Sequence, residues 1–522
     1  MHKVFEIPEL VDLIVQCLVV YTPIPLKYRP TPVLSCLTTD AYREIIAVGQ
    51  TARLFRNPSL NALWRVQISL IPLLRSVGLV TREEKVWGVT TVVTFNTNRS
   101  IHDVNICALL PYSSRITELH FTSIGQVTYQ DDFFVDNHAP PSSLFPALRV
   151  LTSRADRTGS LELTFVLRNV ENALQRLDIA RCPLPLQLFE APFKTSSLAS
   201  LSLNLLHDRG EVIVPVQLAP ILQRCHRLQV LYLVLDFDIS CILRSLVRLP
   251  SLTRLTLFLH EVPLPSIPTR MILPSVVHLR LFVQYAGSLQ LTTHILSKCT
   301  LPTLTFLEVQ FCHAQPSLTE AAHLFTAITS SNPTATLRSL TLSVKFDEHV
   351  RTGERLHSDT LRPLLVLPIR SLFLDLPWLW NLDDGLICDM ARAWPNLEVL
   401  SMDTICFSTL STSASATVSG LEALVRYCPA LRHIEIPFSG TVTVPAAALD
   451  LSTVPAHARR ENTRVAVLGV GCGVVTSPIE TAMYLRKIFP RLKGVTPVST
   501  TSSDIVESWR KVGAILSETV KT

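Results

Sequence analysis

A few residues in this chain have the types and spacing that catalysis or metal binding requires. Asp236 and Asp238 lie two residues apart in an apolar stretch, so in a strand their carboxylates would share one face. Two carboxylates placed in this way can bind a cation or act as an acid and base pair. A surface acidic patch explains the same pair, and we favour that interpretation. His260 and Glu261 lack the second histidine of a zinc-binding helix.

A glycine-rich turn lies near the end of the chain. Within Val467–Val474, an apolar run leads into Gly469, Gly471 and Gly473, as in the cofactor-binding turns of methyltransferases and dinucleotide-binding folds. That chemistry requires an acidic residue at the end of a following strand, about 20 residues on. The sequence there is IFPRLKGV, without a carboxylate, so we expect a last repeat strand that ends in a glycine turn. We predict that the chain is not an enzyme and has no catalytic residue, cofactor or metal.

Composition narrows the function classes further. The 12 cysteines are scattered, without a C-x-x-C pair, which argues against a zinc site and against a disulfide framework. Reduced thiols indicate a cytoplasmic or nuclear protein. The net charge of +5 comes without a long basic run, and no run of about 18 uncharged apolar residues occurs. We therefore predict neither a nucleic-acid partner nor a membrane partner.

The element that would position any binding residue is a repeated unit of the form Leu-x-x-Leu-x-Leu. Its clearest copy is LTRLTLFL at 252–259. There Leu255 and Leu257 alternate with Arg254 and Thr256, which is the period of two of a strand with one buried face. Further copies begin at Leu198, Leu228, Val276, Leu304, Leu337, Ile369, Leu397 and Leu431.

Segments with helical spacing separate these strands. Leu421, Leu424 and Cys428 fall on one helical face, and Pro429 ends the helix before the next strand. One strand and one helix cannot bury their apolar faces alone, so successive units must stack. The sequence therefore predicts an α/β fold: a leucine-rich-repeat solenoid over 113–495, with parallel inner strands and outer helices. A linker and a C-terminal capping helix are predicted over 496–522.

Residues 1–75 do not carry the repeat and predict a small all-helical head. Pro8 lies near the start of an amphipathic helix, whose apolar face consists of Leu10, Leu13, Ile14, Cys17 and Leu18. A proline-rich insertion follows, and then one or two more helices that end at Trp64. Residues 76–112 have a poor pattern and predict a connecting segment with an irregular strand.

The head resembles an F-box. The resemblance is carried by Ile7-Pro8-Glu9-Leu10, by the helix through Ile14 and Leu18, and by Ala47-Val48, Phe55 and Leu63-Trp64. An F-box followed by leucine-rich repeats is the order found in fungal F-box proteins, so the resemblance extends over most of the chain.

This resemblance implies a role in ubiquitin-dependent degradation. In F-box proteins the head docks on the small adaptor subunit of an SCF-type (cullin-RING) ubiquitin ligase, and through it on a cullin, while the repeats bind the target protein. Carried over by position, the adaptor contacts would be Ile7, Pro8, Leu10, Ile14, Leu63 and Trp64. Two alternatives stand beside this interpretation. These residues could pack the head onto the first repeat, or the chain could be a non-ligase interaction scaffold with a degenerate F-box.

The strand residues that alternate with the leucines should form an exposed face for a protein substrate. Aromatic and charged side chains mixed in this way suit protein recognition better than a uniform phosphate-binding stripe does. About half of them are equally well explained as ordinary solvent-facing residues. The predicted substrate-binding residues are Tyr232, Arg254, His278, Arg280, Phe306, Glu308, Phe373, Asp375, Asp403, His433 and Glu435.

Overall fold

The chain forms two compact units, one made of Met1–Asp236 with Cys241–Leu252 and one made of Phe237–Ser240 with Thr253–Thr522. The computed structural model describes residues 8–19, 21–24, 34–86, 90–95, 108–121, 127–129, 143–153, 160–170, 173–180, 197–204, 215–260, 262, 264–266, 270–284, 288–312, 317–345, 355–376, 378–402, 416–440, 462, 464–470, 475–497 and 503–518. The predicted head and the first repeats belong to the same unit.

The first unit begins with the helical head. Its helices are α1 (Pro8–Cys17), α2 (Thr39–Thr51) and α3 (Arg53–Arg65). The Thr38 hydroxyl begins α2 by accepting a hydrogen bond from the Ala41 N–H at 3.1 Å. Within the proline-rich insertion, β1 (Tyr21–Ile24) pairs antiparallel with β2 (Leu34–Leu37), so the head is not all-helical as predicted. A small apolar core of Val15, Ile45 and Ala62 holds the three helices together.

The head continues directly into the repeats of the first unit. Strand β3 (Val66–Gln67) follows α3 and pairs in parallel with β6 (Glu118–Phe121). The Thr117 N–H donates to the Arg65 carbonyl at 3.0 Å, which fixes the end of α3 to the start of that strand. Between them the chain forms α4 (Ile71–Ser76), β4 (Val80–Val86), β5 (Thr90–Phe95) and α5 (Leu110–Ser113).

The remaining strands of the first unit are all parallel. Beyond β6 they follow in the order β8 (Val150–Ser153), β9 (Arg176–Ala180), β10 (Ser200–Asn204) and β11 (Val230–Leu235). A separate small sheet is made by β4, β5 and β7 (Val127–Tyr129). The helices between these repeats are α6 (Ser160–Arg168), α8 (Pro215–Arg224) and α9 (Ser240–Leu246).

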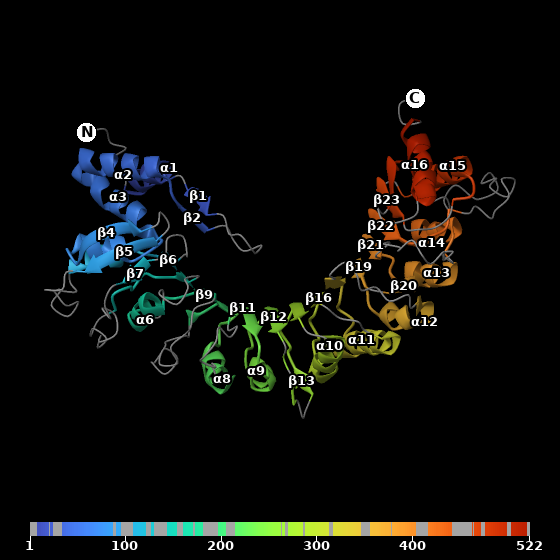
Figure 1. Ribbon diagram of the computed structural model, residues 1–522, viewed down its shortest axis with the longest axis horizontal. Helices are drawn as coiled ribbons and strands as arrows, with labels where there is room; N and C mark the ends of the chain where they lie inside the picture. The colour runs from blue at the N-terminus through green and yellow to red at the C-terminus, as the bar shows by residue number, and fades with distance from the viewer. Residues whose placement is uncertain are drawn as a thin grey trace. The chain divides into compact units, whose positions relative to one another are not determined.

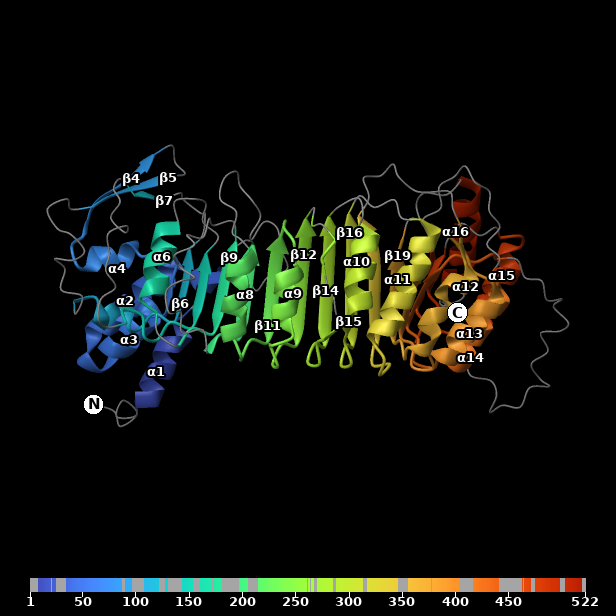
Figure 2. The ribbon, with the colours of Figure 1, turned by 90° about the horizontal axis from the view of Figure 1, so that it is seen from below.

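The second unit repeats the same alternation of strands and helices. Its parallel strands follow in the order β12 (Arg254–His260), β14 (His278–Gln284), β16 (Phe306–Cys312), β17 (Ser339–Lys345), β19 (Ser371–Asp375), β21 (Val399–Met402), β22 (His433–Ile436), β23 (Val467–Val470) and β24 (Gly494–Pro497). One face of this sheet is covered by α10 (Ser288–Lys298), α11 (Leu318–Ser331), α13 (Asp384–Ala393), α14 (Val418–Tyr427) and α15 (Pro478–Ile488), as Figures 1 and 2 show.

Alternating leucines build the core of the second unit. In β12, Leu255, Leu257 and Leu259 are buried, while Arg254 is exposed on the other face. The parallel register places Leu255 beside Leu279 and Leu257 beside Leu281, so each repeat closes the apolar face of its neighbour. Burying one such side chain contributes roughly 1.5–3 kcal/mol. The predicted leucine-rich-repeat solenoid is confirmed.

Buried polar groups of the turns find partners across repeats. The Asn332 amide donates to the Leu301 and Leu304 carbonyls at 2.9 and 3.2 Å, and its carbonyl accepts from the Thr336 N–H at 2.7 Å. Asn462, in the turn before β23, likewise donates to the Leu431 carbonyl at 2.8 Å. Because a buried backbone group without a partner is costly, these asparagines stabilise the turns that join the strands.

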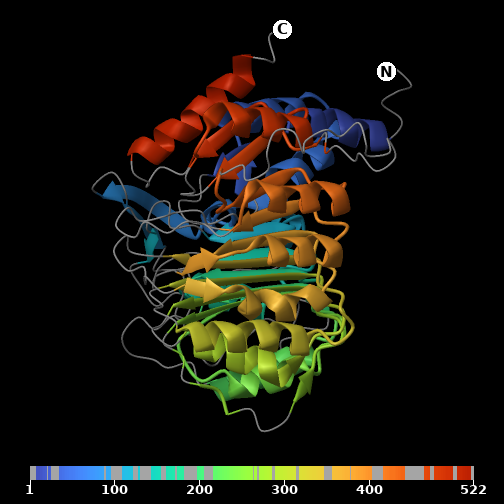
Figure 3. The same cartoon turned by 90° about the vertical axis from the view of Figure 1, so that its right-hand side faces the viewer.

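The second unit ends in a helix, α16 (Ser503–Glu518), which packs on α15 and β24 (Figure 3). Trp509 on α16 is fully buried, and its ring meets Phe438 edge-on with a centroid distance of 5.4 Å. A side chain on Gly440 would collide with Val475 and crowd Trp509, so a glycine is needed beneath this indole. The helix covers apolar surface that the last repeat would otherwise expose.

Candidate functional site

The front face of the second unit, defined as the side of its sheet opposite the helices, carries most of the predicted substrate-binding residues. The parallel register aligns them in rows. Arg254, His278 and Phe306 form one row, and Arg280 and Glu308 lie side by side in the next. Side chains that are far apart in the sequence are thereby brought together on adjacent strands.

A compact group of charged and aromatic side chains lies on β14 and β16. The Arg280 Nε is 2.9 Å from a Glu308 carboxylate oxygen, and the Arg280 guanidinium lies 5.4 Å from the centre of the Phe306 ring. The His278 ring packs near the same phenylalanine, at a centroid distance of 5.6 Å. Phe306 thus lies against two basic side chains of β14, and the Arg280 guanidinium is within the range of a cation–π contact.

Two front-face residues outside the predicted substrate-binding set form an aromatic step. Phe258 and Phe282 are register partners on β12 and β14, and their rings stack at 4.0 Å with an interplanar angle of 8°. Both are half-buried. The signal that would have found them was the next alternate position of each strand, two residues beyond Thr256 and Arg280.

The predicted residues on the later strands form a second group. Phe373 on β19 is 38% exposed, and Asp375 follows it on the same side. On β22 the Glu435 carboxylate accepts a hydrogen bond from the Ser401 hydroxyl at 2.9 Å and lies 3.7 Å from the His433 Nε2. Asp403 lies outside the described residues.

Tyr232 belongs to the first unit, on β11, where it is half-buried, and the same face is closed over earlier strands of that unit. His120, Thr152 and Asp178 are register neighbours on β6, β8 and β9, and only 3%, 2% and 5% of their surfaces are exposed. The His120 Nε2 lies 3.5 Å from a Glu118 carboxylate oxygen, while its buried Nδ1 has no hydrogen-bond partner among the described residues. Sequence alternation gave no sign of this buried polar row.

The Glu118 carboxylate is stabilised in its charged form. A hydrogen bond with His120 lowers the pKa of Glu118 below its usual value, burial opposes this, and the charges of His120, Arg65 and Arg176 add to the lowering. The geometry is that of an ion pair at the edge of a buried polar row.

The first helix of the head has two apolar sides. Val11 and Val15 are buried against the rest of the head. Leu13 is 55% exposed, Ile14 is 37% exposed, and Cys17 is exposed beside them. The apolar face that the sequence predicts on this helix therefore points largely to solvent, because the side that packs inward is the valine side.

The other predicted adaptor contacts have mixed placements. Pro8 begins α1, Leu10 is half-buried, and Ile7 lies outside the described residues. Leu63 packs against the core of the head. Trp64 is half-buried, and its ring lies 5.0 Å from the Tyr112 ring of α5. Trp64 therefore joins the head to the segment that follows it.

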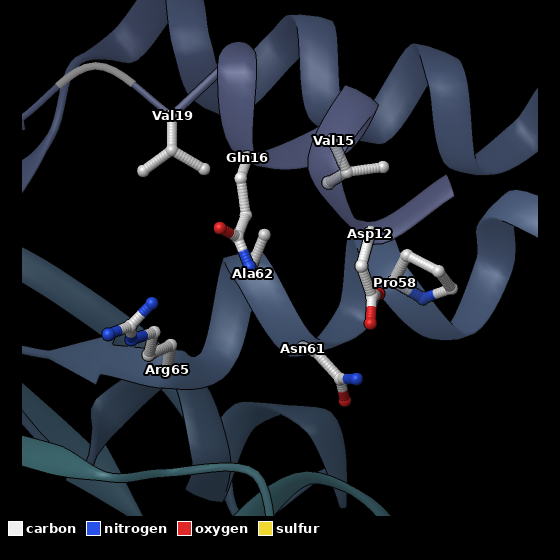
Figure 4. Close-up of a pocket in the computed structure, with 8 residues that line it drawn as sticks. All are labelled: Asp12, Val15, Gln16, Val19, Pro58, Asn61, Ala62 and Arg65. Atoms are coloured by element: carbon white, nitrogen blue, oxygen red, sulfur yellow. The ribbon is translucent and has the colours of Figure 1, made fainter. Parts of the chain in front are cut away.

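A cleft of about 260 Å³ opens between α1 and α3. In Figure 4, Gln16 reaches toward Ala62, Asp12 lies beside Pro58, and Arg65 stands at the other end. Its lining combines the apolar side chains of Val15, Val19, Pro58 and Ala62 with the polar side chains of Asp12, Gln16, Asn61 and Arg65.

The residues considered for chemistry have structural roles. Asp238 accepts hydrogen bonds from the Ser240 N–H and hydroxyl at 2.9 and 2.6 Å and so begins α9. Gly469 lies in β23, where a Cβ would come within 2.7 Å of the Glu435 side chain, so packing explains this glycine. Among the described residues, no group of three or more His, Cys, Asp or Glu side chains is placed to hold a metal ion.

Two cysteines with strongly raised pKa values are protonated thiols. Burial raises the pKa of Cys299 and of Cys428 to about 12 in each case. The Cys428 thiol donates to the Trp394 carbonyl at 3.3 Å, which satisfies the turn after α13. Across the described ranges, no helix is both long and apolar enough to cross a membrane.

Comparison with known proteins leaves the chain without a family. No protein-family model matches it, and no curated protein matches its sequence. Among solved structures, it is similar to an internalin (inlF) from Listeria monocytogenes, with 12% identity and a TM-score of 0.33 over 88% of this chain and 95% of that one. At this level of similarity the comparison bears on neither activity nor partners.

Proposed function

We propose that the chain is the substrate-recognition subunit of an SCF-type ubiquitin ligase. The head would dock on the small adaptor subunit and, through it, on a cullin, while the front face of the second unit would bind the target protein. The observation that carries this proposal is the outward apolar side of α1. The resemblance of the head to an F-box places two of its residues, Leu10 and Ile14, at the adaptor contact.

The outward side of α1 has the properties of a docking surface. At about 100° per residue, Leu10, Leu13, Ile14 and Cys17 fall on one side of the helix and the buried Val11 and Val15 on another. Exposed apolar residues gathered on one helix side, unlike single scattered ones, mark a contact with another molecule. Burial of Leu13 and Ile14 by a partner would contribute about 25 cal/mol for each Å² of apolar surface covered.

In this proposal catalysis belongs to the partners. The chain would hold a target protein close to the ligase and so raise its effective concentration there. The mixed charged and aromatic side chains of the front face suit a protein target, since aromatic residues and arginine are enriched in protein interfaces.

A binding experiment with the purified adaptor tests the proposal. We expect the full chain to bind the adaptor and the double variant Leu13→Asp, Ile14→Asp to lose binding, because charges would enter an apolar contact. Gln16→Asp, on another side of the same helix, is the control and should bind like the wild type. Both positions of the double variant are exposed, so its circular dichroism spectrum should match that of the wild type.

A second function, a protein-interaction scaffold without a ligase, is favoured by one contact. Trp64 packs on Tyr112 and Leu63 on the core of the head, so two of the residues assigned to the adaptor are used inside the chain. If the folded wild type fails to bind the adaptor, the scaffold becomes the better account.

A further inference from the structure

One part of the front face carries positive charge that its neighbours only partly balance. This cationic corner consists of Arg254 on β12 and of His278 and Arg280 on β14. Arg254 is exposed and makes no ion pair among the described residues. Arg280 is paired with Glu308 at 2.9 Å, but half of its side-chain surface remains exposed. One carboxylate therefore faces two guanidinium groups and an imidazole.

The pKa of His278 reflects this excess of positive charge. His278 is the register partner of Arg254 and lies two residues before Arg280 on its own strand. Burial lowers the pKa of His278 below its usual 6.5, and the charges of Arg254 and Arg280 lower it further. Across β16 it faces Phe306, with Glu308 as the nearest acidic side chain there. The cationic corner would therefore stabilise a negatively charged group bound beside it.

The aromatic step lies next to the cationic corner along the same strands. Phe282 is two residues beyond Arg280, a separation of roughly 7 Å along a strand. The stacked rings of Phe258 and Phe282 present an apolar surface of two half-buried side chains. An extended peptide has the same rise per residue, so side chains two positions apart in a peptide can reach both features.

We propose that the cationic corner and the aromatic step together bind an extended segment of the target protein that carries an anionic side chain two residues from a large apolar one. The anionic group sits among Arg254, His278 and Arg280, and the apolar side chain rests on Phe258 and Phe282. This inference deepens the proposed recognition role, since it rests on target binding at the front face. The anionic group is either a carboxylate or the phosphate of a modified serine or threonine.

A protein segment fits this face better than a nucleic acid does. Glu308 lies in the same rows as the cationic corner, and Asp375 and Glu435 lie on the same face of later strands. A continuous phosphate backbone would be repelled by these carboxylates, whereas one anionic side chain needs only the corner itself.

Selection from a random library of peptides of about twelve residues, displayed and panned on the purified full chain, tests the inference. We expect enriched peptides to carry Asp or Glu two positions from Phe, Leu, Trp or Tyr. Fluorescence anisotropy of the best labelled peptide then compares three versions: the acidic residue itself, its amide, and phosphoserine in its place. The amide should bind at least about tenfold more weakly than the better of the two anions. Whichever of the carboxylate and phosphoserine peptides binds more tightly identifies the anionic group that the cationic corner recognises.

Variants of the chain locate the contact. Arg254→Gln with His278→Gln should weaken binding of the selected peptide about tenfold or more, and Phe258→Ala with Phe282→Ala should do so independently. The control is His323→Gln with Arg426→Gln, exposed on α11 and α14 away from the front face, which removes one histidine and one arginine and should leave affinity within about twofold. Selected peptides without acidic enrichment, no selected peptides, or equal binding by the corner variant would each overturn the inference.

A pH titration gives a readout that a purely structural role of His278 would not move. A bound anion raises the pKa of His278 from its lowered value, so binding of the carboxylate peptide should strengthen as pH falls from about 8 to about 6. In His278→Gln this dependence should disappear. These measurements use no adaptor, so loss of adaptor binding with peptide binding intact would remove only the ligase proposal.

Discussion

The sheets of the two units follow one pattern on their leucine side and differ on the other. In the first unit the row of His120, Thr152 and Asp178 is buried. In the second unit Arg254 and Arg280 occupy the same kind of position and are exposed. Alternation along a strand decides which side of the sheet a residue faces. It does not decide whether that side meets solvent.

The difference changes what a polar residue must do. A histidine in the closed row has to find partners inside the protein or leave atoms unsatisfied, as His120 leaves its Nδ1. A histidine on the open face, such as His278, can form hydrogen bonds with solvent or with a bound partner. The open face is therefore the one available for recognition.

The largest effects should fall on the leucine side, and there the two units should behave alike. Leu151→Ala in β8 and Leu255→Ala in β12 both remove a fully buried side chain and leave a cavity between repeats. We expect each to lower the free energy of unfolding by about 2–5 kcal/mol, measured by urea denaturation. An unchanged midpoint in either variant would contradict the stacking of its repeat.

Substitution of one histidine in each unit should affect stability differently. His120→Ala removes a buried side chain and its contact with Glu118, so we expect a loss of about 1–3 kcal/mol. His278→Ala, on the open face, should change stability by no more than about 0.5 kcal/mol. Similar losses in both variants, by the same urea denaturation, would mean that the faces do not differ energetically.

The dependence of stability on pH below neutrality should sharpen the contrast between the two histidines. Because the pKa of Glu118 is lowered in the folded state, its ion pair stabilises the protein above the ordinary value of 4.5, and this stabilisation disappears as pH falls through the lowered pKa. The stability gap between the wild type and His120→Ala should therefore narrow below about pH 4.5. Thermal unfolding between pH 7 and pH 3 measures it, and a constant gap would disprove the role of Glu118.

The smallest effect is expected for the ion pair of the open face. Arg280→Met keeps the stem that packs near Phe306 and removes the bond to Glu308. Since Arg280 is half exposed, the change in stability should stay below about 1 kcal/mol. Glu308→Gln is the matched control for the other partner and should cost no more. A larger loss in thermal unfolding would show that the pair is part of the core.

Sequence patterning was sufficient for the fold and only partly sufficient for the site. The period of two in Leu255 and Leu257, and the helical period of Leu421 and Leu424, correspond to β12 and α14 because each pattern follows directly from backbone geometry. The strands β1 and β2 lie in a stretch where prolines hid the pattern.

What sequence reasoning missed depends on packing at a distance. On α1 both the leucine side and the valine side are apolar, and only the positions of α2 and α3 decide that Val11 and Val15 turn inward. Trp64 meets Tyr112, a residue 48 positions later, whose proximity no local pattern indicates. Phe258 and Phe282 lie at alternate positions of their strands, but their stacking depends on the register between β12 and β14, which no local pattern indicates.

The register of the second unit has a consequence for how such a chain can change in evolution. Arg254 pairs with His278 after 24 residues, and Phe306 pairs with Ser339 after 33, yet each strand begins opposite the start of its neighbour. At each of these joins one carbonyl accepts two N–H groups from the next repeat, as Thr253 does from Val277 and His278. The differences in length are absorbed between the strands. Loops on this scaffold are free to lengthen or shorten while the pattern of side chains on the sheet is inherited intact.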